Sequence, residues 1–279
     1  MVILKKIIIT EKEKDLMNKM HSGFNSKTYE LDGNVYKFFS DNYKYMSDEN
    51  LLRIKLEMSD ELNLPGIIIP NGILINEEGN LLGARYPKVG TEFKLYTSDL
   101  QTCTKRHVGI SKILQNASNQ DVVLPDFLTS SNFRLNSDGT IFIIDYDGMQ
   151  VKEIPTSGRS GGLDDFFINN LFIGEKYFDV SKKISTGYNL WTKEVNVFNS
   201  IVFYFMDCLG IVISTIKDNT EFYISKLGLE EDEINQKIWK IFSPYPNEYF
   251  TDDEFNLIND KYDLKPMPDL AGCKRFVRK

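Results

Sequence analysis

The chain has 279 residues, of which 33 are Lys or Arg and 40 are Asp or Glu, so its net charge is -7. At about 150 residues per domain, this length predicts two compact units or one large two-lobed domain. The negative charge argues against nucleic acid or a membrane surface as the main partner, because such binding depends on clustered cations. With 42% hydrophobic residues, the composition is that of a globular protein.

Cysteine and histidine are too few and too scattered for a zinc site or a disulfide framework. Cys103, Cys208 and Cys273 form no CxxC pair, and the two histidines lie far apart. The longest apolar stretch, residues 200–216, is shorter than the roughly 20 residues that span a bilayer and contains Asp207. We interpret it as a buried helix and expect a reducing, cytoplasmic setting.

The first ninety residues carry mainly strand signals. Residues 1–10 are typical of a strand, and the runs TYEL and VYKFF flank Asp32-Gly33-Asn34, which predicts a hairpin because these residues tolerate positive φ. Three short strands follow at 67–69, 72–75 and 81–86. We therefore predict a small antiparallel β lobe over residues 1–90.

One helix interrupts this lobe. Leu51, Ile54, Met58 and Leu62 are spaced by three and four residues, which places them on one helical face. Pro65-Gly66 then ends the helix. We therefore predict that these four residues form the apolar face of the helix.

After a junction at residues 88–91, helical patterns dominate. Residues 97–116 predict a helix, 122–124 form a short apolar run, and 140–145 predict a strand that ends in an acid. Further helices are predicted at 165–172, 192–216 and 231–242, and we expect the basic segment 273–279 to fray. The sequence thus predicts an α+β fold with a helical C-terminal lobe over 91–279 and a ligand between the lobes.

Two features of the first lobe are candidates for phosphate binding. The loop from Ser22 to Ser26 contains Gly23 and could place backbone N–H groups over phosphates, although an ordinary hairpin turn would have the same composition. Lys37 lies inside the apolar strand VYKFF. It is either an edge charge facing water or a buried cation that meets a phosphate.

Two features of the second lobe are candidates for proton transfer and metal binding. Asp126 and Asn132 lie in LPDFLTSSNFRL, after an apolar run. The strand IIDYDG delivers Asp145 and Asp147 at its end. Carboxylate and amide oxygens are donors that Mg²⁺ accepts, and a carboxylate can take a proton from a hydroxyl. Turns use the same residue types, so each motif alone is ambiguous.

Taken in order, these motifs resemble the protein-kinase-like superfamily over residues 20–210. In particular, IDYDGMQ is similar to a bacterial branch that carries IDxDxxQ in place of DFG, and Asn132 and Asp145 are 13 residues apart, as the family's two metal ligands are. The resemblance implies that Lys37 contacts ATP phosphates and pairs with an acid on the following helix, with Glu57 as the best candidate and Glu61 as an alternative.

The resemblance implies a two-lobed kinase-like fold that binds ATP and Mg²⁺. Gly23 and Ser26 would lie over the phosphates, Asn132 and Asp145 would hold the metal, and Asp126 would act on an acceptor hydroxyl, preferably of a protein Ser or Thr. The sequence also departs from the family, with one glycine in the loop and Leu-Pro before Asp126. These departures support an alternative, a pseudokinase that binds a protein partner without catalysis.

A second alternative comes from another class. FIIDYDGMQ also resembles the DxDGT motif of haloacid-dehalogenase-like phosphatases, in which Asp145 would be the nucleophile and Asp147 the acid/base. That fold needs βαβ units after the motif, whereas the sequence there is helical. The phosphatase alternative also leaves Lys37 without a role.

Overall fold

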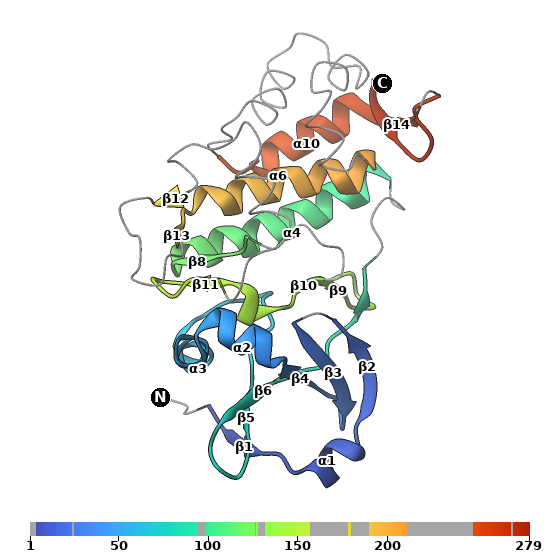
Figure 1. Cartoon of the computed structure of the whole chain (residues 1–279). Coiled ribbons are helices and arrows are strands. Elements are labelled where there is room, and N and C mark those ends of the chain that lie inside the picture. Colours follow the sequence, from blue (N-terminus) through green and yellow to red (C-terminus); the bar gives the residue numbers. More distant parts are fainter. Residues whose placement is uncertain are drawn as a thin grey trace.

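The chain forms an α+β structure, with a six-stranded sheet and helices α1 to α3 at one end and helices α4, α6 and α10 at the other (Figure 1). The computed structural model describes residues 4–23, 25–93, 99–125, 127, 132–156, 178–179, 190–210, 248–268 and 270–279. The helices predicted at 165–172 and 231–242, and the predicted acid Asp126, lie outside these residues. The predicted α+β class is confirmed.

The six-stranded sheet is mixed. Its strand order is β1-β5-β6-β4-β3-β2, and β1 runs parallel to β5 while the other neighbours are antiparallel. The strands are β1 (Lys6–Ile8), β2 (Asn18–Ser22), β3 (Ser26–Leu31), β4 (Asn34–Phe39), β5 (Gly72–Ile75) and β6 (Leu81–Pro87). The prediction of a wholly antiparallel sheet was wrong, because the long segment between β1 and β5 supplies the connection that a parallel pair requires.

The hairpin predicted from TYEL and VYKFF is confirmed as β3 and β4. Asp32 and Gly33 form its turn, with φ values of 49° and 70°. Asp and Gly adopt such left-handed values at low cost, so the turn is encoded locally.

A close contact between β4 and β6 fixes the backbone at Lys37. Gly83 lies opposite this part of β4, and a methyl group built on it would be 1.9 Å from the carbonyl oxygen of Lys37. Only glycine fits at this position without displacing one of the two strands.

Three helices, not the predicted one, belong to the first ninety residues. They are α1 (Glu11–Asp15), α2 (Asp41–Ser47) and α3 (Glu49–Met58), the last followed by a short 3-10 turn, η1 (Ser59–Glu61). The first two are too short to show an apolar period, but each begins at a hydroxyl cap. Thr10 caps α1 and Ser40 caps α2. In the sequence, these capping residues were therefore the signal from which the two short helices could have been predicted.

The buried face of α3 differs from the predicted one. Leu52, Lys55 and Leu56 are buried, whereas Ile54 is 45% exposed. The prediction followed apolar spacing alone and could not anticipate a lysine on the inner face. A lysine can be buried there because its stem is apolar and its ammonium group finds an acceptor.

The predicted helices at 97–116 and 192–216 are confirmed, although the second ends at Leu209, and the strand predicted at 140–145 covers Ile141–Ile143. Its helices and strands up to residue 210 are β7 (Thr91–Glu92), α4 (Leu100–Asn119), β8 (Val122–Val123), β9 (Phe133–Leu135), β10 (Ile141–Ile143), β11 (Gln150–Val151), β12 (Phe178–Asp179), β13 (Leu190–Trp191) and α6 (Glu194–Leu209). Helices α4 and α6 pack against each other, and every residue of α6 after its first is buried. No described helix combines the length and apolarity needed to cross a bilayer.

The C-terminal segment is ordered by strand pairing. Helix α10 (Asp252–Lys261) leads into β14 (Tyr262–Pro266), which pairs antiparallel with β15 (Lys274–Arg278). The expected fraying of this basic segment was wrong, because Phe276 is buried against Tyr262 and Phe205. The charges of β15 flank one buried aromatic ring, which anchors the strand.

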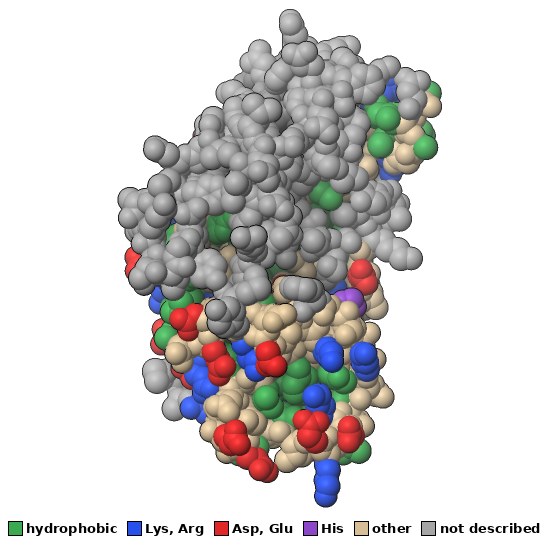
Figure 2. Space-filling model, viewed as in Figure 1, with side chains coloured by type: hydrophobic (Ala, Val, Ile, Leu, Met, Phe, Trp, Pro, Cys, Tyr) green, Lys and Arg blue, Asp and Glu red, His purple; other side chains and the backbone are tan. Residues whose placement is uncertain are grey.

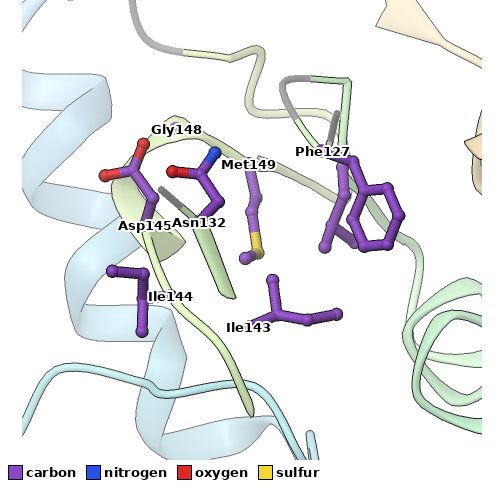
Figure 3. A pocket seen from close by; sticks show the side chains of 8 residues that line it. Phe127, Asn132, Ile143, Ile144, Asp145, Gly148 and Met149 are labelled. Carbon is purple, nitrogen blue, oxygen red and sulfur yellow. The ribbon is translucent and has the colours of Figure 1, made fainter. Parts of the chain in front are cut away.

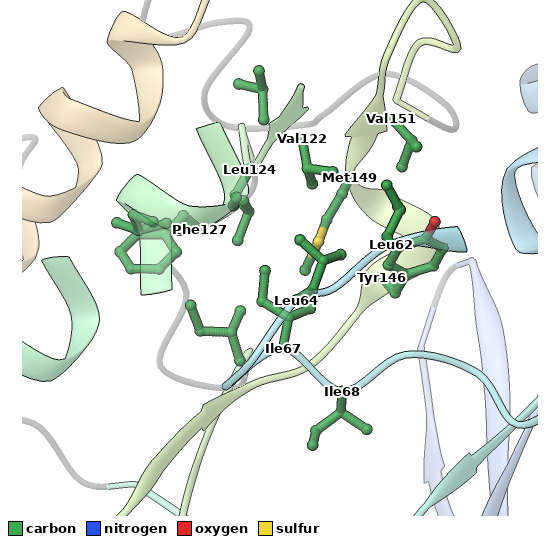
Figure 4. Close-up of a cluster of buried hydrophobic side chains, with 14 of the residues drawn as sticks. Leu62, Leu64, Ile67, Ile68, Val122, Leu124, Phe127, Tyr146, Met149 and Val151 are labelled. Atoms are coloured by element: carbon green, nitrogen blue, oxygen red, sulfur yellow. The ribbon is translucent and has the colours of Figure 1, made fainter. Parts of the chain in front are cut away.

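One cluster of buried side chains runs through both parts of the chain. It contains Leu4 and Phe39 from the first part and Phe203 and Met206 from α6. Figure 4 shows its middle, where side chains from the 62–68 segment, β8 and β11 converge. The predicted boundary near residue 90 stays a prediction, and the described residues pack across it.

Candidate functional site

Asp145 and Asp147 lie directly after β10, where the strand turns into the 3-10 segment η3 (Tyr146–Gly148). Asp145 has φ 77° and ψ 41°, a left-handed conformation that costs energy in any residue except glycine and is best tolerated by Asp and Asn. A methyl group built on Gly148 would be 2.8 Å from Oδ2 of Asp145. The glycine therefore leaves room for the Asp145 carboxylate.

Lys37 of β4 reaches both acids. Its Nζ contacts the Asp145 carboxylate directly and lies 2.9 and 2.8 Å from Oδ1 and Oδ2 of Asp147. The Lys37 side chain is 13% exposed, that of Asp145 is 29% exposed and that of Asp147 is fully buried. Of the two alternatives for Lys37, the structure selects the buried cation, and it leaves Asp145 as the acid closer to solvent.

Two tyrosines complete the surroundings of Asp147. The Tyr86 hydroxyl donates to Oδ1 at 2.8 Å, and the Tyr43 hydroxyl donates to Oδ2 at 2.9 Å. With Lys37 bonded to both oxygens, the Asp147 carboxylate accepts four hydrogen bonds from the ends of three side chains. Buried charges persist only when they are paired in this way.

These contacts shift the pKa values of Lys37, Asp145 and Asp147. Burial by itself lowers the pKa of Lys37, but the carboxylates of Asp145 and Asp147 outweigh burial and raise it above the value of an exposed lysine. Burial raises the pKa of Asp147, yet Lys37 and the two tyrosine hydroxyls bring the net value below normal. For Asp145, burial prevails over the attraction of Lys37, so its pKa is raised. Of the two acids, Asp147 is therefore the one whose ionised form the site favours.

Helix α3 contributes a second buried lysine. Lys55 Nζ donates to the backbone carbonyl of Asp147 at 3.1 Å, and the Tyr146 hydroxyl donates to the carbonyl of Lys55 at 3.1 Å. Burial is the main reason that the pKa of Lys55 is lowered to about 7. Helix α3 is therefore fastened to the IDYDG segment by polar bonds as well as by packing.

Glu57, predicted to pair with Lys37, is not brought to it. Glu57 is exposed on the outer face of α3, and the described partners of Lys37 are the two aspartates. The alternative Glu61 is exposed too. The correction follows from the rotated face of α3, because the helical position nearest the site is taken by Lys55.

Asn132 and Asp145, the predicted metal ligands, are brought together. Both line a cavity of about 10 Å³, and Figure 3 shows the Asn132 carboxamide beside the Asp145 carboxylate. The backbone holds the pair in place, because Ile144 N–H donates to the carbonyl of Asn132 at 2.9 Å. A space of this size accommodates about one water molecule or ion. Its oxygen donors suit Mg²⁺, which prefers hard ligands.

Gly23 and Ser26 form the turn between β2 and β3. Gly23 N–H donates to the carbonyl of Ser26 at 2.9 Å, which closes the turn. The turn lies two residues along β3 from Thr28, the cross-strand partner of Lys37. The predicted loop thus joins β2 and β3 at the same end of the sheet as the Lys37 site, and phosphate binding by it stays a prediction.

Two buried amides of α6 position the segment that precedes Asp126. Asn196 accepts a hydrogen bond from Leu124 N–H at 2.9 Å and donates to the carbonyl of Val122 at 2.8 Å. Asn199 donates to the carbonyl of Leu124 at 2.6 Å. The sequence contained a signal for this role, since two asparagines stand in the most apolar helix of the chain. Nothing in the sequence singled out Tyr43, Tyr86 or Lys55.

A larger groove lies elsewhere, between α4 and the β9–β10 hairpin. Its volume is about 600 Å³, a size that suits a small ligand. Its cations make contacts within the fold, because Arg106 stacks on Phe93 and Lys112 pairs with Asp252. On the face seen in Figure 2, acidic and basic side chains are interspersed over the sheet. The larger group of buried charged side chains lies around Lys37 and not in the groove.

No family model matches this chain, and no curated protein matches it either. The function is therefore argued from the geometry of the site.

Proposed function

We propose that the chain is a kinase-like phosphotransferase that binds ATP and Mg²⁺ between the sheet and the helices. The observation that carries the proposal is the convergence of Lys37, Asp145 and Asn132, which come from three separate segments. A cation from a strand beside a carboxylate and an amide is the arrangement that phosphoryl transfer uses. The fold class and the order of the motifs support it.

Each residue has a defined task in this proposal. Lys37, held charged by its acid partners, binds the nucleotide phosphates. Asn132 and Asp145 hold Mg²⁺, which when bound neutralises charge on the transferring phosphoryl group. Because Lys37 and Asp145 contact each other directly, this contact would have to open for Lys37 to bind phosphate and for Asp145 to hold the metal.

The proposed transfer forms one bond and breaks one. The oxygen of an acceptor hydroxyl bonds to the γ-phosphorus, the bond from that phosphorus to the bridging oxygen breaks, and ADP leaves with the electron pair. Asp126, predicted from the sequence, takes the hydroxyl proton. Asn196 and Asn199 support this step by fixing the main chain at Leu124. We propose a protein Ser or Thr as the acceptor.

A pseudokinase is the second candidate. The direct contact of Lys37 with Asp145, and a cavity beside it with room for about one water, favour a protein that keeps the site closed. The residues before Asp126 also depart from the kinase pattern. In this function the chain binds a protein partner and transfers no phosphate.

The phosphatase alternative has less support. Its acid/base would be Asp147, but that side chain is fully buried and its two oxygens accept four hydrogen bonds. The strand that carries the motif, β10, pairs antiparallel with β9, whereas the phosphatase fold places its motif in a parallel sheet. An acid/base must reach its substrate.

Thermal unfolding with and without nucleotide tests the proposal. At a concentration about 100 times Kd, Mg-ATP stabilises a binding protein by about 2.7 kcal/mol, which raises Tm by several degrees. We expect this rise in the wild type and in the matched control Glu57→Gln, and its loss in Asp145→Asn. A wild type whose Tm does not respond to Mg-ATP would contradict the phosphotransferase.

Transfer of label from γ-³²P-ATP then separates the two candidates. Catalysis is supported if the wild type labels itself or lysate proteins. Asp126→Asn should abolish this labelling, although Mg-ATP still raises the Tm of that variant. ATP binding without any labelling, over a panel of lysates and divalent metals, supports the pseudokinase.

A further inference from the structure

The groove of about 600 Å³ beside α4 has no task in the proposed transfer. One of its walls is a stripe of α4 that runs from Thr102 to Ile113, with residues at intervals of three and four. The β9–β10 hairpin and Pro65-Gly66 form the other wall. At 1.5 Å per helical residue, the stripe is about 16 Å long. An extended peptide of about five residues spans this length.

Gly109 lies in the middle of the stripe and leaves the helix surface open there. It is exposed, and a methyl group built on it would have no atom within 4 Å. Packing therefore gives no reason for a glycine, which destabilises a helix relative to alanine. Around this opening the groove is lined by the half-buried apolar side chains Ile113, Leu135 and Phe142. The glycine thus keeps space for an apolar group of a ligand.

The charge of the groove is opposite to that of the whole chain. Its described lining has three cations and one acid, whereas the chain has a net charge of -7. Lys105 is exposed, and its ammonium group makes no ion pair in the described part of the chain. Lys112 pairs with Asp252, but these side chains are 63% and 61% exposed, and such pairs contribute little. The two lysines are about 10 Å apart along the helix, so they can meet two separate acids.

The groove adjoins the strand that leads to the proposed catalytic site. Phe142 of β10 lines the groove, and Asp145 follows it by three residues. Between them, Ile143 N–H donates to the carbonyl of Gly66 in the other part of the groove wall at 2.8 Å. A partner that occupies the groove therefore lies next to the segment that carries Asp145.

We propose that this groove docks an extended acidic segment of a protein partner, in which two acids flank an apolar residue. The acids pair with Lys105 and Lys112, and the apolar side chain lies over Gly109 against Ile113 and Phe142. The identity of the partner rests on the proposed function, since both candidate functions involve a protein, but the binding itself does not. A membrane or nucleic acid fits less well, because the cations line a concave groove in an acidic chain.

A peptide array tests the charges. The probes are short synthetic peptides with two Asp or Glu about three residues apart and one Leu, Ile, Val, Phe or Met between them. For the best binder, fluorescence anisotropy should show at least about tenfold weaker binding to the charge-reversal variant, Lys105→Glu with Lys112→Glu. Lys6→Glu with Lys19→Glu is the matched control, because it changes two exposed lysines of β1 and β2 by the same charge. It should alter the Kd by less than about twofold.

A swap of charges shows that the variant is folded. A peptide with Lys in place of both acids should bind the charge-reversal variant better than the wild type. The assignment is overturned if no array peptide binds the wild type, or if the two double variants weaken binding equally. Vesicles with phosphatidylserine that bind through Lys105 and Lys112 when no peptide does would assign the groove to a membrane instead.

Gly109→Leu tests the apolar part of the groove. Leucine favours a helix and meets open space at this position, so Tm should not fall while peptide affinity falls at least about tenfold. Gln115→Leu is the matched control, since Gln115 is exposed on α4 and does not line the groove. Full binding by Gly109→Leu, or by the wild type to a peptide with Ser as its middle residue, would contradict the proposed docking.

Acceptor assays separate this inference from the proposed function. If both hold, fusing the best peptide to a Ser-containing acceptor lowers the KM for that acceptor about tenfold or more with an unchanged kcat, and the charge-reversal variant loses this gain. A wild type that binds the peptide but ignores Mg-ATP would remove the phosphotransferase and keep the docking groove. A wild type that labels acceptors but binds no array peptide would keep the function and remove the groove.

Discussion

The two ends of the molecule position polar groups by different means. At the sheet end, Lys37 and Asp147 are buried as full charges and held by hydroxyls. At the helical end, Asn196 and Asn199 hold main-chain groups through neutral amides. A buried charge interacts strongly with its partners, but its removal from water costs much free energy. A buried amide costs less free energy and still fixes the position of the groups it bonds. At these two sites, charge stands where a charged ligand is proposed and amides stand where the backbone needs support.

The largest expected effect comes from removing charge at the sheet end. Asp147→Asn leaves Lys37 with Asp145 as its carboxylate partner and removes the charged acceptor of two buried tyrosine hydroxyls, so we expect a loss of about 3–5 kcal/mol in the free energy of unfolding. Urea denaturation followed by circular dichroism measures it. If the loss is under about 1 kcal/mol, the buried pair is not the costly charged arrangement described above.

The matching change at the helical end should cost somewhat less. Asn196→Leu removes hydrogen bonds to Leu124 N–H and to the carbonyl of Val122, which leaves two buried backbone groups without those partners. We expect a loss of about 2–4 kcal/mol by the same denaturation assay. Asn196→Asp should also destabilise, because a carboxylate would face the carbonyl of Val122. Full tolerance of Asp at this position would show that the helical end accepts charge as readily as the sheet end.

Gly83→Ala tests the close approach of β4 and β6 without changing any charged side chain. The added methyl group would overlap the carbonyl oxygen of Lys37 and push β4 away from β6. Overpacking of this kind costs about 1–3 kcal/mol. Thermal unfolding should show the lower Tm, and Gly109→Ala serves as a control because no atom lies within 4 Å of a methyl group there and its φ is not positive. Equal Tm values for the two variants would contradict the close approach of the strands.

Lys55→Met should stabilise the chain slightly, by about 1–2 kcal/mol at pH 7. The pKa of Lys55 is lowered to about 7 in the folded chain, whereas an exposed lysine has a pKa of 10.5. Between pH 7 and pH 10.5, Lys55 is therefore protonated in the unfolded chain and neutral in the folded chain. The penalty of burying Lys55 is therefore complete below pH 7 and disappears as the pH approaches 10.5. The gain from Lys55→Met should shrink in parallel when urea midpoints are compared at pH 7 and pH 9.5. A gain that is independent of pH would assign the effect to packing.

The sequence predicted well those elements whose signals are local. The hairpin turn at Asp32-Gly33, helix α4 and the apolar helix α6 all follow from spacing or turn chemistry within a short window. The pairing of Asn132 with Asp145 came from a resemblance, and the structure brings the two residues to one cavity. What the sequence did not reveal depends on contacts between distant segments.

Three examples show why. Lys55 is buried because its ammonium group donates to the backbone carbonyl of Asp147, so the apolar pattern of α3 indicated the wrong buried face. Tyr86 and Tyr43 have ordinary strand and helix positions, and only the folded chain shows that both hydroxyls meet Asp147. The strand β15 forms because β14 is its neighbour, which a basic tail does not predict. Tertiary partners override local preference in each case.

The left-handed backbone at Asp145 limits how this position can vary over evolution. Of the residues with a side-chain oxygen, Asp and Asn adopt that conformation most readily, so Glu, Ser and Thr are disfavoured by shape before chemistry is considered. Asn is therefore the easiest replacement, and it keeps the length and the turn while losing the negative charge. A descendant with Asn at this position would retain the architecture and lose the carboxylate that we propose holds Mg²⁺. In the proposed function, loss of catalysis at this residue would therefore require no change of backbone conformation.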